Sequence, residues 1–444
     1  MIVNHEKLGF RADRPKLPSM RETMASAALL LLAGCATAPH SRPSEIPVSQ
    51  VGVAFDMNGE TGSFAEGLAD PAAGRAVTTD DPVRIASVSK LVVAVGVMKL
   101  AEQRKLDLDS DVSGWLGWKL RNPAFPNQPI SLAMLLSHTS SLRDYQDRYA
   151  IPLGDTVRAI VEEPTSWDPK HGPADSYFTY SNLNFPVVAS IVEKVTGERF
   201  DLWMRREVIE PMKLDACYNW PTCSDEKVAR AVVLTQDGKP VRDDLGGKRP
   251  DCALYVETGP CDLARWKPAE NGALFAPQGG LRISMHDLAR VGRMLLSRGT
   301  LDGVQILSRA SVETMLVPRW RYDGRNGDTD KGFYCAYGLA VQLLPVAVSG
   351  CKDDPAGDGI ARAGHGGDAY GLRSGLWIDR ASRTGIAFFV TGLSDDPARG
   401  RSAFRAAEEA AFRRSLQLAN GPCSLRKQRT KAAPIPRCRY AARS

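Results

Sequence analysis

The order of the predicted elements indicates a mixed α/β protein with one antiparallel sheet built from both ends of the chain. Strand-like apolar patterns open the chain at 51–68 and close it at 372–390. The middle, about 101–275, is instead typical of short helices joined by loops that contain Pro and Gly. We therefore expect α/β parts at about 48–100 and 276–418, helices flanking the sheet, and an all-α insertion between the two parts.

Each predicted strand pair surrounds a turn signal. Residues 51–55 form a short apolar run, and Asn58-Gly59 is the strongest two-residue hairpin signal, so a second strand is expected up to Leu68. Near the other end, 372–378 and 385–390 are alternating or apolar runs on either side of a polar turn. Both patterns predict antiparallel neighbours.

Three segments predict the main helices. Residues 85–100 are apolar on all sides, which places this helix in the interior. Residues 181–196 form a second helix, which Gly197 ends. A third helix is expected at about 398–418, with one apolar face and a stop at Gly421-Pro422.

The positive charge of the chain is concentrated at one end. The 444 residues carry a net charge of +6, but 415–444 contain seven Lys or Arg and no acidic residue. The rest of the chain is therefore nearly neutral, which argues against a nucleic-acid partner bound by a folded face. We expect 419–444 to be a solvated basic tail.

The N-terminal part resembles an export signal. Residues 25–34 are a short apolar run that ends in small residues, as in a cleaved signal peptide. Leu32-Ala33-Gly34-Cys35 resembles a bacterial lipobox, in which the cysteine is lipidated. This resemblance implies a signal at 1–34, with Met20 as an alternative start, a tether at 35–47, and a periplasmic protein anchored to the membrane, in our expectation the outer one. A buried helix with an incidental cysteine is the alternative.

Cysteine usage fits export. There are nine Cys, so lipidation of Cys35 leaves eight, an even number suited to disulfides in an oxidising compartment. Spacing favours three local pairs, although connectivity stays open: Cys217 with Cys223, Cys252 with Cys261, and Cys335 with Cys351. A zinc site is disfavoured because no two Cys are only two to four residues apart and no His lies at ligand spacing. We expect no metal and no cofactor.

A Ser-x-x-Lys motif opens the buried helix. On a helix, Lys90 lies one turn from Ser87, and a desolvated neutral lysine can activate a serine for attack on a carbonyl. The alternative role of Ser87, a helix N-cap, fits poorly because a cation in the first turn opposes the helix dipole. Three other Ser-x-x-Lys runs start at Ser224, Ser349 and Ser424, but none opens a buried helix.

Two further motifs accompany it. Tyr180-Ser181-Asn182 precedes the second predicted helix, where an aromatic staple with a serine cap is the alternative. His365-Gly366-Gly367-Asp368 leads into the 372–378 strand. Its glycines would let a substrate backbone approach, and a Gly-rich turn with a surface His is the alternative.

In this order the three motifs resemble those of the serine β-lactamase and penicillin-binding protein superfamily, nearest the class C β-lactamase, DD-peptidase and carboxylesterase branch. Flanking segments agree, namely His138-Thr139-Ser140-Ser141-Leu142, with Ser141 in place of the usual Gly, and Gln278-Gly279-Gly280-Leu281. The resemblance covers about 48–418 and implies a β-lactamase/transpeptidase-like catalytic domain.

The resemblance also implies roles for the motif residues. Ser87 would be the nucleophile, Lys90 its base and Tyr180 a proton relay, and whether Lys90 or Tyr180 is the working base stays open. Asn182 would hold the substrate amide or the lysine, and the backbone N–H groups of Ser87 and Asp368 would form the oxyanion hole.

One departure bears on the substrate. His365 stands where many relatives have a lysine that binds a substrate carboxylate, and a neutral His binds it less strongly. Arg362 or Arg373 could supply the missing charge. We expect a serine hydrolase that forms an acyl-enzyme from an ester, amide or β-lactam carbonyl, with esterase or D-amino-acid peptidase activity favoured over efficient β-lactam hydrolysis, and with His365, Gly366 and Gly367 binding the substrate.

Two alternatives belong to other classes. A penicillin-recognising sensor or cell-wall binding module would have lost Ser87, Lys90 or Tyr180, and all three are present. An intracellular thiol or metal enzyme conflicts with the lipobox-like segment and the lack of His at ligand spacing.

Overall fold

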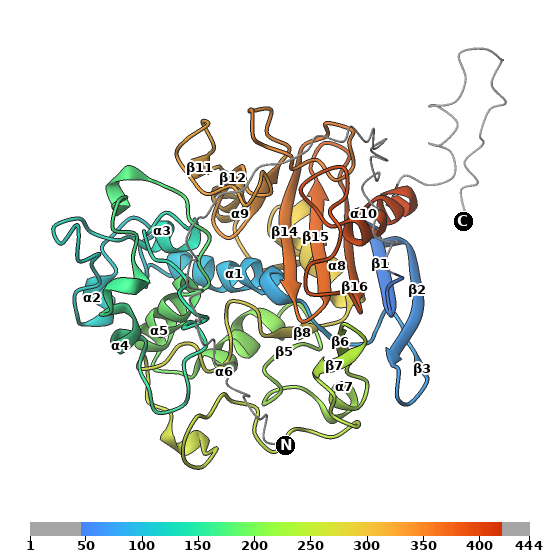
Figure 1. Ribbon diagram of the computed structural model, residues 1–444, viewed down its shortest axis with the longest axis horizontal. Helices are drawn as coiled ribbons and strands as arrows, with labels where there is room; N and C mark the ends of the chain where they lie inside the picture. Colours follow the sequence, from blue (N-terminus) through green and yellow to red (C-terminus); the bar gives the residue numbers. More distant parts are fainter. Residues whose placement is uncertain (1–45, 420–444) are drawn as a thin grey trace, which may run out of the picture. The chain divides into compact units, whose positions relative to one another are not determined.

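The computed structural model describes residues 46–419, and a large antiparallel sheet dominates this part of the chain (Figure 1). Strands from both ends of the chain meet in its centre, where β1 pairs with β16 over eight residue pairs from Ser49–Thr391 to Asp56–Thr384. The order across the sheet is β11 (Trp320–Arg321), β12 (Ala336–Tyr337), β13 (Gln342–Leu344), β14 (Arg362–Ala369), β15 (Leu372–Asp379), β16 (Thr384–Thr391), β1 (Ser49–Asp56), β2 (Glu60–Asp70) and β3 (Arg75–Ala76). The predicted sheet built from both ends is confirmed.

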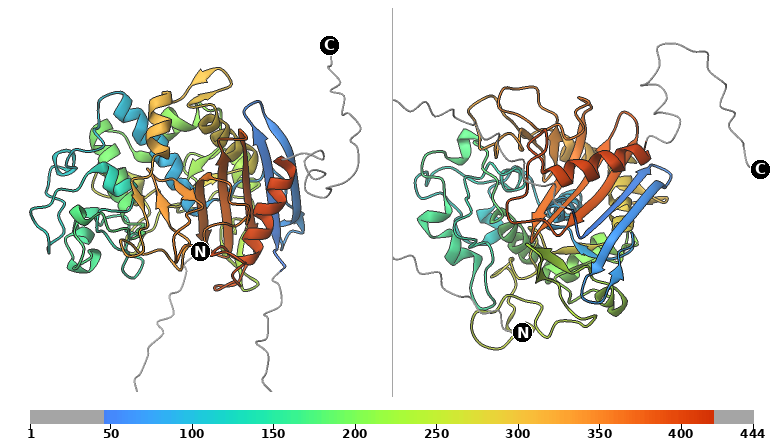
Figure 2. Two further views of the ribbon diagram at one scale, coloured as in Figure 1. Left: turned by 90° about the horizontal axis from the view of Figure 1, so that it is seen from above. Right: turned by 45° about the vertical axis from the view of Figure 1, so that its right-hand side comes forward.

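Helices cover both faces of this sheet (Figure 2). Neighbouring residues of a strand point to opposite faces, and Phe388 on β16 packs against Phe412 of α10 (Ala406–Ala419), whereas Ala387 and Phe389 belong to the main core. On that core side, α8 (Met285–Leu296) brings Gly292 so close to the Phe55 ring that a Cβ atom would overlap it. The sheet is therefore a layer between α8 and α10.

The central helix α1 (Ser89–Glu102) is buried on nearly every side, as its apolar sequence predicts. It begins later than the predicted residue 85, because Ala86 takes a left-handed φ of +46° and a 3-10 turn, η1 (Ala86–Val88), precedes it. β14 packs against η1, which brings the sheet next to the start of α1.

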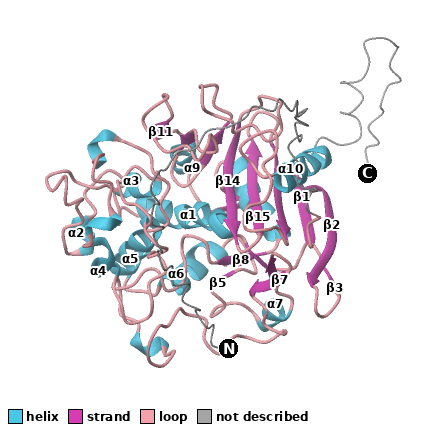
Figure 3. Ribbon diagram, viewed as in Figure 1, coloured by secondary structure: helices cyan, strands magenta, loops and turns pink. Residues whose placement is uncertain are grey.

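The middle of the chain forms a region of short helices joined by long loops beside the sheet (Figure 3). Its helices are α2 (Ser113–Leu116), α3 (Leu132–Leu136), α4 (Val157–Val161), α5 (Asn184–Thr196), α6 (Phe200–Met204) and α7 (Asp225–Ala229). This region also contains short strands that the sequence analysis missed, namely β5 (Cys217–Tyr218), β6 (Leu234–Gln236) and β7 (Lys239–Arg242). β5 joins β4 (Val83–Arg84) and β8 (Leu281–Ile283) in a small sheet, in the order β4-β8-β5.

The remaining elements are short. They are the hairpin β9 (Thr300–Leu301) and β10 (Val304–Gln305), α9 (Arg309–Leu316), the 3-10 turns η2 (Pro164–Ser166), η3 (Pro173–Asp175) and η5 (Leu263–Arg265), and the π-helical turn η4 (Arg205–Ile209) that continues α6. All three predicted cysteine pairs are disulfides, while Cys35, Cys423 and Cys438 lie outside the described residues. Within 46–419 no helix is long and apolar enough to cross a membrane.

Two predicted helix starts were wrong for a common reason, since a carboxylate binds the backbone ahead of each helix. The second predicted helix begins at Asn184 rather than 181, because Asp144 accepts the N–H groups of Asn182 and Leu183. The last helix begins at Ala406 rather than 398, because Glu409 holds the preceding loop through the Ser402 N–H at 2.6 Å.

Candidate active site

Ser87 and Lys90 are in direct contact at the start of α1. Lys90 Nζ donates hydrogen bonds to Ser87 Oγ at 2.9 Å, Asn182 Oδ1 at 2.8 Å and the Gln278 carbonyl at 2.8 Å. The lysine is 0% exposed, and this burial lowers its pKa to about 7, although the Asp144 charge acts in the opposite direction. A large share of Lys90 is therefore neutral at pH 7 and able to accept a proton.

Ser87 is not a helix cap. Neither η1 nor α1 has a side-chain hydrogen bond at its N-cap position. Its hydroxyl is instead bonded to Lys90 and lines a cavity, so the capping alternative does not describe this serine.

Tyr180 lies between two aromatic rings at the same cavity. Its ring stacks on His138, with centroids 4.3 Å apart, and on Tyr334, at 4.6 Å. Burial raises the pKa of Tyr180 above its ordinary value, although the hydroxyls of Ser87 and Tyr334 act in the opposite direction. Tyr180 is therefore a neutral hydroxyl at pH 7, which can donate a proton but is a poor base in this state.

Asp144 fixes the Tyr-Ser-Asn turn. Its carboxylate accepts from Ser181 Oγ, from the backbone N–H groups of Asn182 and Leu183, and from Asn182 Nδ2, all within 2.9 to 3.0 Å. This leaves Asn182 Oδ1 directed at Lys90. Sequence analysis missed Asp144, whose only signal is its place two residues after the His138–Leu142 segment.

The two glycines of β14 have different roles. A Cβ on Gly367 would lie 2.5 Å from the Ile85 carbonyl oxygen and 2.3 Å from Ser374 Oγ, so only glycine lets β14 approach the backbone that leads to Ser87. Gly366 lines the cavity, and its nearest obstacle is the Phe333 ring at 3.3 Å. Gly367 is thus required by contacts within the protein.

His365 is buried beside the cavity rather than in its wall. Its ring is 0% exposed and does not line the cavity. One ring nitrogen bonds the Tyr337 hydroxyl at 2.5 Å, and the other bonds the Gly366 carbonyl at 2.6 Å. Burial and the Lys90 charge lower the pKa of His365 to about 3, so it is neutral. A contact of the His365 side chain with substrate stays a prediction, and in this structure the ring does not reach the cavity.

A cavity of about 390 Å³ joins the remaining site residues. It is lined by Ser87, Tyr180, Asn182, Gly366, Gly367 and Asp368, with Lys90 buried beneath Ser87. Of the two arginines considered from sequence, Arg373 lines this cavity and pairs with Asp368, whereas Arg362 pairs with Asp358 outside it. Sequence analysis also missed Glu408, which lines the cavity and whose pKa burial raises to about 8.

Two named proteins are similar in sequence to parts of this chain. The chain is 27% identical to penicillin-binding protein 4 of Amycolatopsis lactamdurans and 30% identical to esterase EstB of Burkholderia gladioli, over 61% and 40% of its length. The matches cover 66% and 47% of those proteins, less than two thirds of either.

The fold and the family follow from two further matches. The class C β-lactamase of Rhodobacter sphaeroides superimposes with a TM-score of 0.59 at 16% identity, over 84% of this chain and 95% of that one. A model of the family described as Beta-lactamase matches residues 49–411. Because that match spans most of the chain and the fold agrees with it, the chain belongs to the β-lactamase family.

Proposed function

We propose that this protein is a serine hydrolase that is acylated on Ser87 and that prefers esters and D-amino-acid amides or peptides to β-lactams. One observation carries the proposal, the contact of 2.9 Å between Ser87 Oγ and a buried lysine whose pKa is about 7. A hydroxyl next to a desolvated amine is the arrangement that nucleophilic catalysis by serine requires.

In the proposed reaction, neutral Lys90 accepts the Ser87 proton while Oγ bonds to the substrate carbonyl carbon. The backbone N–H groups of Ser87 and Asp368 bind the oxyanion. The proton then passes by way of the Tyr180 hydroxyl to the leaving oxygen or nitrogen. The bond between this leaving atom and the carbonyl carbon breaks. Water, deprotonated by the same base, releases the acyl group from Ser87.

The charges of the cavity support the substrate preference. Within residues 46–419, four arginines line the cavity, and each already has a carboxylate partner: Arg84 has Asp243, Arg373 has Asp368, Arg399 has Asp330 and Arg405 has Asp396. The anionic group of a β-lactam would therefore meet partly neutralised cations, which weakens the attraction. The relative named as an esterase supports ester hydrolysis.

A substrate panel with a covalent probe tests the proposal. We expect turnover of p-nitrophenyl esters or D-alanyl-D-alanine peptides at a higher kcat/KM than nitrocefin. An activated phosphonate should lose its leaving group to Ser87 Oγ and add the mass of the remaining phosphonyl group, less one proton, to the peptide that contains Ser87. A protein that binds penicillin but shows neither turnover nor a covalent adduct would instead be the non-catalytic sensor.

We also propose that the protein is exported and lipidated on Cys35, which lies outside the described residues. Support comes from the Leu32–Cys35 lipobox pattern and from three disulfides, which persist in oxidising compartments such as the periplasm.

Lipidation gives a direct prediction. In cells fed a labelled fatty acid, the wild-type chain is expected to take up label and to fractionate with membranes, while Cys35→Ala takes up none, because the acyl chain is attached only at that thiol. Cys423→Ala is the matched control, which should keep the label. Equal labelling of wild type and Cys35→Ala contradicts the proposal.

A further inference from the structure

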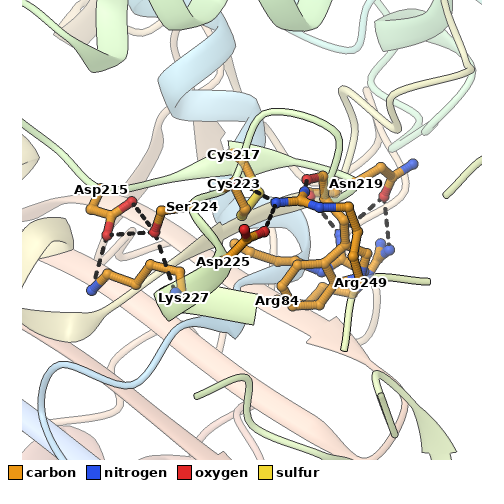
Figure 4. Close-up of a disulfide and its surroundings, with 12 residues drawn as sticks. Arg84, Asp215, Cys217, Asn219, Cys223, Ser224, Asp225, Lys227 and Arg249 are labelled. Atoms are coloured by element: carbon orange, nitrogen blue, oxygen red, sulfur yellow. Dashed lines mark hydrogen bonds and ion pairs between the residues drawn. A yellow bond between two sulfur atoms is a disulfide. The ribbon is translucent and has the colours of Figure 1, made fainter. Parts of the chain in front are cut away.

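A loop from a distant part of the chain holds the segment that leads to Ser87. β4, which ends at Arg84, pairs with β8, and β8 pairs with β5. The Cys217–Cys223 disulfide closes the loop that follows β5, and Arg84 lies beside this loop (Figure 4).

Asn219 is the centre of this contact. Its Oδ1 accepts from Arg84 at 3.0 Å and from Arg282 at 3.1 Å, and its Nδ2 donates to the Leu274 carbonyl at 3.1 Å. Both guanidinium groups are buried and have one nearby carboxylate, Asp243, which is 2.6 Å from Arg282 and 3.9 Å from Arg84. The Asn219 oxygen is therefore an acceptor shared by both guanidinium groups, in addition to Asp243 and the Gly279 and Gly280 carbonyls.

The loop holds two successive residues in the left-handed backbone region, with φ values of +47° for Asn219 and +74° for Trp220. Asparagine adopts this region more readily than most residues, whereas a bulky tryptophan is strained there and persists only where its surroundings fix it. Here the disulfide ties the two ends of the loop. Arg249 adds a bond of 2.7 Å to the Cys223 carbonyl.

The contacts continue from Asn219 to the catalytic lysine. The Asn219 N–H donates to the Gly280 carbonyl at 3.2 Å, and Arg84 donates to the Gly279 carbonyl at 3.2 Å. The next carbonyl along, that of Gln278, accepts from Lys90 Nζ at 2.8 Å. Asn219 thus contacts the strip 278–280 directly through its N–H and indirectly through Arg84, which its side chain holds, and this strip supplies one of the three acceptors of Lys90.

We propose that Asn219, held by the Cys217–Cys223 disulfide, is a positioning residue that sets the Gln278 carbonyl against Lys90 and the backbone ahead of Ser87. This inference rests on the proposed role of Lys90 as the base. It assigns to this disulfide an effect on the reaction in addition to its effect on stability.

The chain offers a matched control for the test. The Cys252–Cys261 disulfide closes a loop of similar length, and both of its cysteines are exposed. We compare the double variant Cys217→Ser/Cys223→Ser with Cys252→Ser/Cys261→Ser. Asn219→Gly keeps both disulfides, the left-handed backbone and the N–H bond to Gly280, so it removes only the side-chain bonds to Arg84, Arg282 and Leu274 and tests that part of the contact.

Each variant is assayed for ester hydrolysis across pH 5 to 10 below its unfolding midpoint. We expect kcat to fall about 10- to 100-fold in Asn219→Gly and in the Cys217/Cys223 variant, with KM changing little, because small displacements of catalytic groups have effects of this size. A carbonyl acceptor favours the ammonium form of Lys90, so its displacement should move the acid limb of kcat/KM to lower pH. The Cys252/Cys261 variant should keep the wild-type kcat and pH profile.

Phosphonate labelling of Ser87 distinguishes failure of the proposed function from failure of the inference about Asn219. A wild-type chain that takes no label on Ser87 contradicts the proposed function and the inference that depends on it. A labelled wild type, together with an Asn219→Gly variant whose kcat and acid limb are unchanged, overturns the inference alone. The same holds if both disulfide variants lose activity equally.

Discussion

Replacing Ser87 with alanine is expected to abolish hydrolysis while leaving the thermal unfolding midpoint nearly unchanged. The loss should be about 10⁴- to 10⁶-fold in kcat, since removal of a serine nucleophile leaves only binding and oxyanion stabilisation. Stability should be retained because the Ser87 hydroxyl caps neither η1 nor α1. Lys90 also keeps its bonds to Asn182 and Gln278.

Steady-state kinetics and thermal denaturation of the same samples check both parts. Ser308→Ala is the control, because Ser308 is a true N-cap of α9 and accepts the Ser311 N–H at 3.1 Å. It should lower the midpoint by about 1–2 °C, the size expected for the loss of a cap in a domain this large, with activity unchanged. If Ser87→Ala lowers the midpoint as far as Ser308→Ala does and activity is retained, Ser87 is a helix N-cap and not the nucleophile.

The local chemistry of the site could be predicted from the sequence because it depends on short spacings. Ser87 and Lys90 are one helical turn apart, and the three disulfides join cysteines only 6, 9 and 16 residues apart. The Asn58-Gly59 hairpin also involves neighbours alone. These features needed no knowledge of how distant segments meet.

Features that depend on distant contacts could not be predicted in this way. The side of β14 to which His365 points is set by its pairing with β13 and β15, and the glycines around it carry no alternation of polar and apolar residues. Asp144 binds a turn 37 to 39 residues away, and nothing near it in the sequence distinguishes it from a surface acid. Asn219 and Gln278 are further apart still.

The second large effect is expected at Lys90, where two substitutions separate its charge from its ability to accept a proton. Lys90→Met removes both at similar length. Lys90→Arg keeps the positive charge and donors, but with a pKa above about 12 it cannot be neutral at working pH. If Lys90 is the base, both variants should lose about 10²- to 10⁴-fold in kcat/KM.

The pH profile of the wild type decides the same question independently. Proton acceptance requires neutral Lys90, so kcat/KM should rise as pH increases through about 7, the pKa that burial gives this lysine, and then level off. If Tyr180 were the base, the rise would lie above pH 10, because burial raises its pKa. Lys90→Arg would then keep most of its activity, since a fixed cation beside Tyr180 favours the phenolate.

Measuring kcat/KM from pH 5 to 10 for wild type, Lys90→Arg and Tyr180→Phe distinguishes the two bases. A rise near pH 7 that disappears in Lys90→Arg but persists in Tyr180→Phe assigns the proton to the lysine.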